Sequence, residues 1–244
     1  MLKLNVLGTL RVDGSTPSVV DDLVAQPKAL ALLLYLVLAR PAGFHQRDRL
    51  VTLFWPELDQ EHARAALRKL LHRLRQAVGE DTIESRGSES ISVAPNAVTC
   101  DAVEFVEAIE SDRLRYALDL YQGELLPGFF SPGGGDFERW LDAERAFYQE
   151  RAVQCAWELV QRYARESELT NASQLARIVA RLAPTDERML RRVMTMLDKL
   201  DDRAGAMDVY SRFVARLRKE YDIEPSPETV RVADGIRARS GNVA

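Results

Sequence analysis

The sequence predicts a mainly α-helical protein that carries a small β-sheet and divides into two domains, residues 1–100 and 101–244. Three observations predict this class. Residues 1–100 mix short alternating apolar and polar stretches with helical patterns. Residues 101–244 are helical in pattern almost to their end, and they contain a weak internal repeat. With 46% hydrophobic and 29% charged residues, the chain has enough apolar side chains for ordinary buried cores.

The first predicted element is a short amino-terminal sheet. Residues 2–14, LKLNVLGTLRVDG, alternate apolar and polar side chains, and the pair Asp13-Gly14 is typical of a turn. A helix follows from Pro27, whose missing N–H costs nothing in a first helical turn. This helix contains the apolar run ALALLLYLVLA, residues 29–39. A membrane span needs about 20 such residues, so we interpret the run as a buried helix.

Two further helices and a hairpin complete the first domain. Residues 46–55 predict a short helix that ends before a proline, and residues 62–79 predict a third helix that ends at a glycine. Residues 82–93, TIESRGSESISV, alternate on both sides of a Gly-Ser turn and predict a β-hairpin with Arg86 near its tip. Strands, three helices and a hairpin in this order are typical of a winged helix-turn-helix domain.

The helical pattern of the second domain has one interruption. Residues 125–140, LLPGFFSPGGGDFERW, contain two prolines and four glycines and predict a loop or extended crossing. Gly133 to Gly135 predict a hinge or turn. A phosphate-binding loop is not expected there, because no Lys-Ser/Thr follows and no strand precedes.

The internal repeat lies in the last third of the chain. Ala172 and Ala206, 34 residues apart, open similar amphipathic helices. Predicted helices over about 150–166 and 186–199 precede them. A period near 34 with a small residue at the start of the second helix is typical of tetratricopeptide-like helix pairs. The second domain is therefore predicted to be all-α and tetratricopeptide-like.

The third helix, HARAALRKLLHRLRQAVG, has two different faces. The apolar face, which predicts docking on the first two helices, collects Ala63, Ala66, Leu67, Leu70, Leu71, Leu74, Ala77 and Val78. The opposite face and its flanks collect Glu61, Arg64, Ala65, Arg68, Lys69, His72, Arg75 and Gln76. No acidic residue occurs from 62 through 79, whereas a solvated helix usually mixes both signs. Small Ala65 at the centre of the polar face allows close approach to a groove.

This pattern predicts a helix that enters the major groove of DNA. The overall charge of −4 argues the other way. The local balance is more informative, because residues 59–79 hold five basic and two acidic side chains. Two alternatives stay open: an ordinary solvated helix face, and a helical-repeat scaffold whose winged helix contacts another protein.

An enzyme is not expected. The three histidines and two cysteines show no metal-ligand spacing, and no Gly-x-Ser-x-Gly sequence occurs. We therefore expect no catalytic residue, no metal and no cofactor. The two cysteines predict reduced thiols in a cytoplasmic protein. Residues such as Trp140, Phe147, Tyr148 and Trp157 fall at roughly helical spacing and predict core packing, and no residue points to a ligand of the helical domain.

The chain also resembles a known family over nearly its whole length. The first 100 residues resemble the OmpR-type winged helix of the antibiotic regulatory protein (SARP) family of bacterial activators, through LGTLRVDG, QPKALALLLYLVLARPAG, RDRLVTLFWPELDQEHARAALRKLLHRLRQAVG and the predicted wing. Residues 101–240 resemble the bacterial transcriptional activator domain of that family, through ALDLYQGELLPGF, FERWLDAERAFYQERAVQCAWELV and VYSRFVARLRKEYDIEPSPETV.

The resemblance implies a sequence-specific, DNA-binding transcription activator whose third helix is the recognition helix. The candidate DNA contacts on that helix are Arg64, Arg68, Lys69, His72 and Arg75. Arg86 on the wing is a candidate for the minor groove or the backbone. Lys28, Arg47 and Arg49 are candidates for phosphate contacts, with ordinary surface charge as an equal alternative.

The resemblance also implies partners. In OmpR-type proteins the turn between the second and third helices, here WPELDQ, faces RNA polymerase, which makes Trp55, Glu57 and Asp59 candidates for that contact. For Trp55, core packing is the favoured alternative, and Asp59 also predicts the N-cap of the third helix. Members of the family bind promoter direct repeats as side-by-side dimers. A repressor that blocks promoters is a further alternative.

Overall fold

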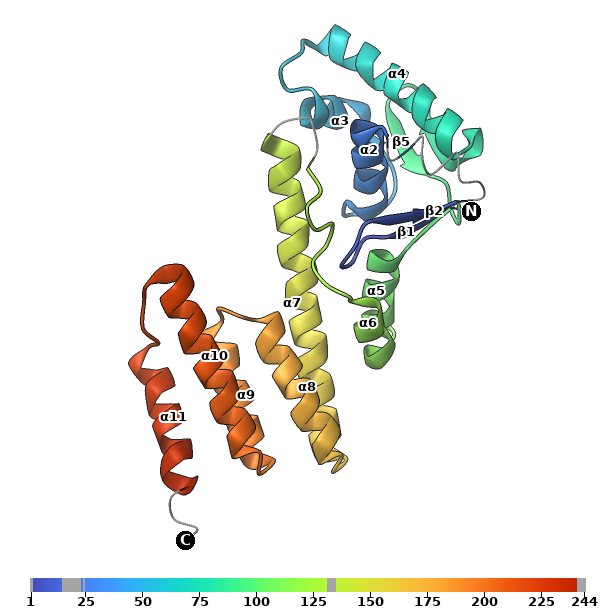
Figure 1. Cartoon of the computed structure of the whole chain (residues 1–244). Helices are drawn as coiled ribbons and strands as arrows, with labels where there is room; N and C mark the ends of the chain where they lie inside the picture. Colours follow the sequence, from blue (N-terminus) through green and yellow to red (C-terminus); the bar gives the residue numbers. More distant parts are fainter. Residues whose placement is uncertain (1, 15–22, 24, 131–134, 241–244) are drawn as a thin grey trace. The chain divides into compact units, whose positions relative to one another are not determined.

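The computed structural model describes residues 2–14, 23, 25–130 and 135–240 (Figure 1). It divides into two compact units, Met1–Tyr148 and Gln149–Ala244, which we call unit 1 and unit 2. The division predicted from the sequence lies elsewhere, at residue 100, and stays a prediction. Among the described residues, no helix is long and apolar enough to cross a membrane.

The amino-terminal sheet of unit 1 has three strands. Strand β1 (Leu2–Asn5) pairs antiparallel with β2 (Arg11–Asp13), as the alternating pattern predicts, and Leu4 lies opposite Val12. Strand β6 (Val98–Cys100) pairs parallel with β1 on the other side, so the order is β2-β1-β6. Strand β6 was not predicted, because a three-residue strand is too short to show a period.

Three helices pack in unit 1 as predicted. Helix α2 (Pro27–Leu38) begins with Pro27 in its first turn and is buried along nearly its whole length, which confirms the interpretation of the apolar run. Helices α3 (Arg47–Phe54) and α4 (Gln60–Val78) follow and pack on each other. The turn between them spans residues 55–59.

The predicted hairpin follows α4 and the short 3-10 helix η1 (Glu80–Thr82). Strands β4 (Ile83–Arg86) and β5 (Ser90–Val93) pair antiparallel, and the last pair before the turn is Arg86 with Ser90. Strand β3 (His45–Gln46) adds to β5, so the order is β3-β5-β4. Three helices and a β-hairpin in this order make a winged helix-turn-helix fold, and Arg86 lies near the tip of the wing.

Unit 1 continues through α5 (Asp101–Glu110), α6 (Leu114–Leu120) and the first part of α7 (Gly135–Arg165). The loop predicted over 125–140 is wrong for residues 135–140, which are helical. Gly135 opens α7 instead of making a hinge, while Gly133 and Gly134 lie outside the described residues. Tertiary packing decides this, because Phe137 is fully buried and Trp140 packs against Tyr35 with tilted rings, at 4.7 Å between ring centroids.

Asp101, at the start of α5, joins this helix to the amino-terminal sheet. Its buried carboxylate accepts hydrogen bonds from the backbone N–H of Val6 at 2.9 and 3.0 Å and of Leu7 at 3.1 Å. Burial raises the pKa of Asp101, and the same hydrogen bonds act against that rise. Asp101 therefore satisfies two N–H groups of the chain that follows β1.

We expect Asp101→Ala to lower the free energy of unfolding by about 2–4 kcal/mol, because it leaves two buried N–H groups without an acceptor. Urea denaturation followed by tryptophan fluorescence measures the change. Asp119→Ala, at an exposed position on α6, is the control with an expected change below about 0.5 kcal/mol. Equal stability of the two variants would contradict the anchoring role of Asp101.

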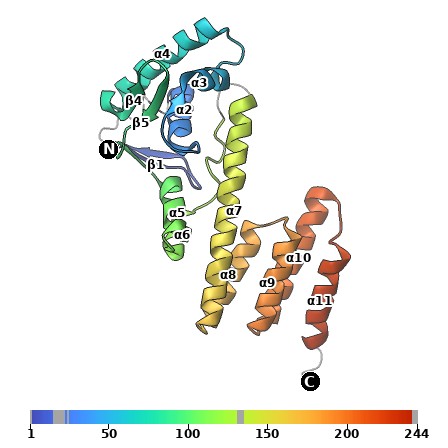
Figure 2. The ribbon, with the colours of Figure 1, turned by 180° about the vertical axis from the view of Figure 1, so that it is seen from behind.

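Unit 2 is all helical, from the last part of α7 through α8 (Leu169–Leu182), α9 (Glu187–Lys199), α10 (Arg203–Tyr221) and α11 (Pro227–Ser240). Neighbouring helices pack side by side in chain order from α8 to α11 (Figure 2). Ala172 and Ala206, which mark the repeat, are fully buried and let the helices approach closely. The tetratricopeptide-like prediction is confirmed.

Glu187 at the start of α9 holds the amino terminus of α11. Its carboxylate accepts hydrogen bonds from the backbone N–H of Ser226 at 3.1 Å and from the hydroxyl groups of Ser226 and Thr229. Burial raises the pKa of Glu187, but these hydrogen bonds and the nearby Arg191 outweigh burial, so the pKa is lowered from 4.5. The carboxylate form is therefore the one that stabilises unit 2.

A pH titration of stability tests this contact. A lowered pKa in the folded state means that the contribution is present above pH 4.5 and is lost as the pH falls through the folded-state pKa. We expect the free energy of unfolding to fall less steeply with decreasing pH in Glu187→Gln than in the wild type. Urea denaturation at several pH values between about 3 and 6 measures both slopes. Identical slopes would rule out the proposed linkage.

Candidate nucleic-acid interface

Helix α4 begins and ends where the sequence predicts. The Asp59 side chain accepts the backbone N–H of His62 at 3.0 Å, so Asp59 is the N-cap, and Gly79 ends the helix with a φ of 103°. The buried stripe of the helix consists of Ala63, Leu67, Leu71, Leu74 and Ala77. This stripe docks α4 on α2 and α3 and leaves the opposite face in contact with solvent.

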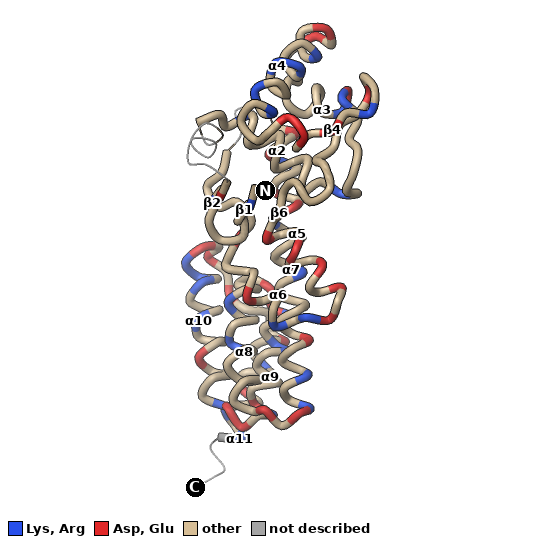
Figure 3. The backbone as a smooth tube through the Cα atoms, turned by 90° about the vertical axis from the view of Figure 1, so that its right-hand side faces the viewer, with Lys and Arg blue, Asp and Glu red and all other residues tan. Residues whose placement is uncertain are grey.

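The exposed face presents Arg68, Lys69 and His72 together. All three side chains are exposed, and within the described part of the chain none makes an ion pair or a side-chain hydrogen bond. Small Ala65 lies on the same face and is exposed as well. Figure 3 shows the positive charge that follows α4 beyond its first turn. The sequence analysis placed these residues on this face correctly.

Arg64 differs from the other arginines of α4. Its guanidinium donates to both carboxylate oxygens of Asp48 on α3, at 2.7 to 2.9 Å. The pair is about half exposed, so its contribution to stability is modest. Its main effect is to hold the Arg64 guanidinium at the α3 side of the face, with its charge partly neutralised.

Arg75 is half-buried and ties α4 to the wing. Its guanidinium donates to the Ile83 carbonyl oxygen at 3.0 Å and to the Ser85 hydroxyl at 2.9 Å. Arg47, the first residue of α3, donates to the same hydroxyl at 3.1 Å. Ser85 is therefore the point at which both guanidinium groups meet the wing.

Arg47 lies in a strongly positive environment. Burial and then the charges of Arg75 and Arg68 lower the pKa of Arg47, and Glu89 acts against them. An arginine stays protonated in spite of such a shift. The buried Nε of Arg47 has no hydrogen-bond acceptor within the described residues. Three guanidinium groups close together favour an anion beside them.

The remaining basic candidates lie in different surroundings. Arg86 stacks over the Phe44 ring, at 4.0 Å from its centroid, so the ring supports the wing side chain. Arg49 is exposed on α3, and its charge adds to burial in lowering the pKa of His45. Lys28 donates to the Phe54 carbonyl oxygen at 2.9 Å and lies over the Trp55 ring, and burial lowers its pKa.

The residues of the turn between α3 and α4 differ in burial and in their contacts. Trp55 is buried beside Phe54, which agrees with the core-packing alternative. The Asp59 carboxylate caps α4 and makes a hydrogen bond with Nδ1 of His62 at 2.7 Å. The hydrogen bonds with the backbone N–H and the side chain of His62 lower the pKa of Asp59. Glu57 is exposed, and so is Leu58, a residue that the sequence analysis did not single out.

Two more exposed residues of α4 were left out of the candidate set. Gln76 lies on the polar face, and Arg73 lies on its flank. A helical wheel places both residues on the polar side of α4, so the sequence could have predicted both as candidate DNA contacts. Asp48 was missed as well, because its contact with Arg64 joins two helices and depends on their crossing.

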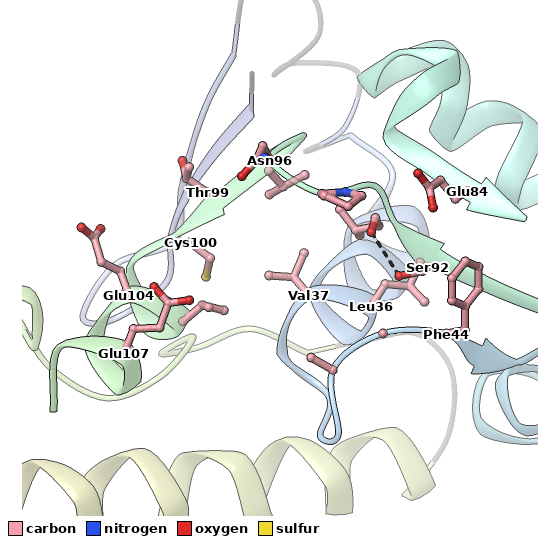
Figure 4. A pocket seen from close by; sticks show the side chains of 16 residues that line it. Leu36, Val37, Phe44, Glu84, Ser92, Asn96, Thr99, Cys100, Glu104 and Glu107 are labelled. Atoms are coloured by element: carbon pink, nitrogen blue, oxygen red, sulfur yellow. Dashed lines mark hydrogen bonds between the residues drawn. The ribbon is translucent and has the colours of Figure 1, made fainter. Parts of the chain in front are cut away.

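A hollow elsewhere in unit 1 has the opposite charge. It has a volume of about 730 Å³ and lies among the carboxyl-terminal end of α2, strands β4 to β6 and α5. Figure 4 shows Glu104 and Glu107 on one side of it and Glu84 on the other. Among the described residues, no arginine or lysine lines it. DNA phosphates are repelled by such a surface, which directs attention to α4 as the candidate interface.

Neither thiol is placed for reaction or metal binding. Within the described residues, Cys100 and Cys155 form no disulfide and are both buried, and burial raises the pKa of Cys100 to about 12 and of Cys155 to about 11. In the described part of the chain, no cluster of three histidine, cysteine, aspartate or glutamate side chains is arranged to hold a metal ion.

Comparisons with known proteins bear on both units. Residues 97–237, more than half of the chain, match the family model of the bacterial transcriptional activator domain. A solved structure of Mycobacterium tuberculosis EmbR in complex with a low-affinity phosphopeptide matches with a TM-score of 0.62 and 20% sequence identity. The match covers 98% of this chain but 65% of the EmbR chain. At this identity the likeness shows a shared fold. No curated protein matches the sequence.

Proposed function

Because the chain belongs to the bacterial transcriptional activator domain family, we propose that this transcription regulator binds duplex DNA and that α4 is its recognition helix. The observation that carries the proposal is the exposed face of α4. It presents Arg68, Lys69 and His72 without an ion pair within the described residues. A helix of this width fits the major groove, where an unpaired arginine or lysine finds its partner on a base edge or a phosphate.

Within this proposal, Arg68 reads the bases. It lies at the middle of α4, next to the small Ala65, and its guanidinium can donate to the two acceptors of a guanine at once. Lys69 and His72 flank it, and they contact phosphates or base edges. Gln76 on the same face can pair with an adenine.

The arginines around Ser85 position the wing and the backbone. Arg75 is held against Ile83 and Ser85, so its role is to set the angle between α4 and the wing. Arg47 contacts a DNA phosphate in this proposal. The negative charge of the phosphate would reduce the repulsion between the guanidinium groups of Arg47, Arg68 and Arg75. Arg86, supported on Phe44, reaches the neighbouring minor groove or backbone.

The other basic candidates contribute less in this proposal. Arg64 and Arg49 meet phosphates at the edge of the groove, and Arg64 must share its guanidinium with Asp48. Lys28 stabilises the end of α3 through the Phe54 carbonyl, so we assign it to the fold.

The proposal extends to the protein partners. We assign the polymerase contact to Glu57 and Leu58, because both are exposed in the turn where Trp55 is buried and Asp59 caps the helix. Binding of two copies to a direct repeat is physically sensible, since a single winged helix buries a modest interface on DNA.

Selection from a pool of random duplexes tests the DNA-binding proposal. The wild type is expected to enrich a direct repeat whose half-sites are about one helical turn, roughly 10 base pairs, apart. A variant with Arg68, Lys69 and His72 all changed to Ala should enrich nothing. Failure of the wild type to enrich any sequence, or equal enrichment by the variant, would overturn the assignment and favour the scaffold alternative. Transcription in vitro on the enriched sequence with purified polymerase then separates an activator from a repressor.

A further inference from the structure

Unit 2 carries a basic groove that the proposed DNA contact does not use. The groove has a volume of about 580 Å³ and lies along α9, between Trp157 of α7 and the first turns of α11. Its lining consists of Trp157, Arg188, Arg191, Arg192, Thr195, Met196, Lys199, Glu228 and Val232. Four of these side chains are basic and one is acidic. Trp157, Met196 and Val232 provide an apolar floor.

Three of the basic side chains form a row on one face of α9. Arg188, Arg192 and Lys199 are exposed, and in the described residues none of them makes an ion pair. At 1.5 Å per residue, they follow one another at about 6 and 10 Å along the helix axis. Like charges in one row repel each other, so the row favours an elongated anionic partner over an empty groove.

The fourth basic side chain, Arg191, is already engaged. Its guanidinium donates to the Thr229 hydroxyl at 3.0 Å and pairs with Glu228 at 3.1 Å. These contacts neutralise the Glu228 carboxylate and hold α11 against α9. The charge of the row is therefore left uncompensated on the side of the groove that faces solvent.

Trp157 supplies an independent sign of a missing partner. The residue is 7% exposed, and its indole N–H has no hydrogen-bond acceptor within the described residues. A buried donor without an acceptor is costly. The exposed guanidinium of Arg192 lies over the indole, at 4.6 Å from the ring centroid. Movement of this one flexible side chain would uncover the face of the indole.

The groove is also longer than a small anion needs. A second hollow of about 420 Å³ shares Trp157 and Arg192 with the first and continues along α7 past Gln154, Glu158, Gln161 and Arg165. The Glu158 carboxylate lies 3.8 Å from the guanidinium of Arg162. An extended peptide rises about 3.3 Å per residue, so its alternate side chains are about 6.6 Å apart. Acidic side chains at alternate positions match the distance from Arg188 to Arg192. The next two positions on the same face of the peptide lie about 6.6 and 13 Å beyond Arg192, on either side of Lys199.

We propose that this groove binds an extended acidic peptide segment of a partner protein. Acidic side chains of the peptide pair with Arg188, Arg192 and Lys199. Arg192 turns away from the indole to meet its carboxylate, and a peptide carbonyl oxygen then accepts the Trp157 N–H. The apolar floor contacts the remaining side chains. This inference does not depend on DNA binding through α4.

Binding of a fluorescein-labelled hexaglutamate peptide to the full chain, followed by fluorescence anisotropy, tests the proposal. Six extended residues reach about 20 Å, enough to span the row. We expect saturable binding that weakens as salt is raised from 50 to 200 mM, and no binding of labelled hexalysine. Arg192→Glu should weaken the affinity for hexaglutamate by at least about tenfold. Trp157→Phe, which keeps a ring and loses the N–H, should weaken it about threefold.

Two control variants separate this groove from other basic surfaces. Lys219→Glu makes the same change of charge at an exposed position on α10 outside the groove, and Arg68→Ala removes the central charge of α4. Both should keep the wild-type affinity within about twofold. Circular dichroism confirms the helix content of each variant before binding is measured.

Three results would overturn the proposal. The first is the absence of saturable hexaglutamate binding. The second is binding that Arg68→Ala abolishes and Arg192→Glu leaves intact, because the peptide would then lie on α4. The third is complete competition by equimolar tripolyphosphate, because the groove would then hold a small anion instead of a peptide.

Discussion

Arg68→Ala is expected to weaken binding to the enriched duplex by about 10- to 100-fold, or about 1–3 kcal/mol. The change removes a side chain that is exposed on the middle of α4 and has no ion pair within the described residues. Its loss therefore leaves the fold intact and takes away contacts made in the complex alone. Since a bidentate contact distinguishes guanine from other bases, the variant should also tolerate substitutions at one position of the site.

Titration of the duplex at several salt concentrations measures this effect. Lys69→Ala is the informative comparison, because loss of a phosphate contact weakens binding to all sequences alike and lowers the salt slope by about 1. Arg181→Ala, exposed on α8 in unit 2, is the matched control with unchanged affinity. Wild-type affinity of Arg68→Ala for the site would remove α4 from the role of recognition helix.

Phe137→Ala is expected to destabilise the winged helix by about 3–5 kcal/mol, although the residue lies 37 positions beyond residue 100, the predicted domain boundary. Phe137 is fully buried in unit 1 and packs against Phe54 at 5.3 Å and Trp140 at 5.1 Å between ring centroids. Removal of the ring leaves a cavity beside α3. The first part of α7 therefore contributes to the stability of the winged helix.

Hydrogen exchange of the backbone amides of α2 to α4 measures this prediction. Exchange in Phe137→Ala should accelerate throughout the three helices. Phe130→Ala is the control with the same change of side chain, because Phe130 is 74% exposed and its loss creates no cavity. If Phe137→Ala left exchange in these helices unchanged, residues 1–100 would be an independent domain, as the sequence predicts.

The local signals in this sequence predicted most of the fold. The Asp59 N-cap, the stripe from Ala63 to Ala77 and the terminal Gly79 give α4 its limits and its buried face. The alternation in residues 82–93 predicts the wing, because strand pairs depend on neighbours a few residues away. Strand β6 and the start of α7 were not predictable in this way, because their partners lie far along the chain.

For the candidate site, the sequence predicted which face of α4 is exposed but not what each charge does. On a helical wheel, Arg68 falls on the polar face and Arg64 and Arg75 fall on its flank, and all three were predicted to contact DNA. In the structure Arg64 is paired with Asp48, Arg75 holds Ile83 and Ser85, and Arg68 is left exposed. These differences arise from contacts with residues on other elements. The spacing of residues along α4 therefore could not predict them.

By itself the sequence determined the winged helix, the helix pairs of unit 2 and the basic face of α4, because periodicity, caps and turns act over a few residues. The tertiary structure alone decided which basic side chains of α4 have partners within the protein and which are left exposed to solvent. It also brought Trp157 together with the row of α9, since Trp157 and Arg188 lie 31 positions apart on different helices. Side-chain contacts depend on how helices cross, and that geometry follows from the packing of the whole unit.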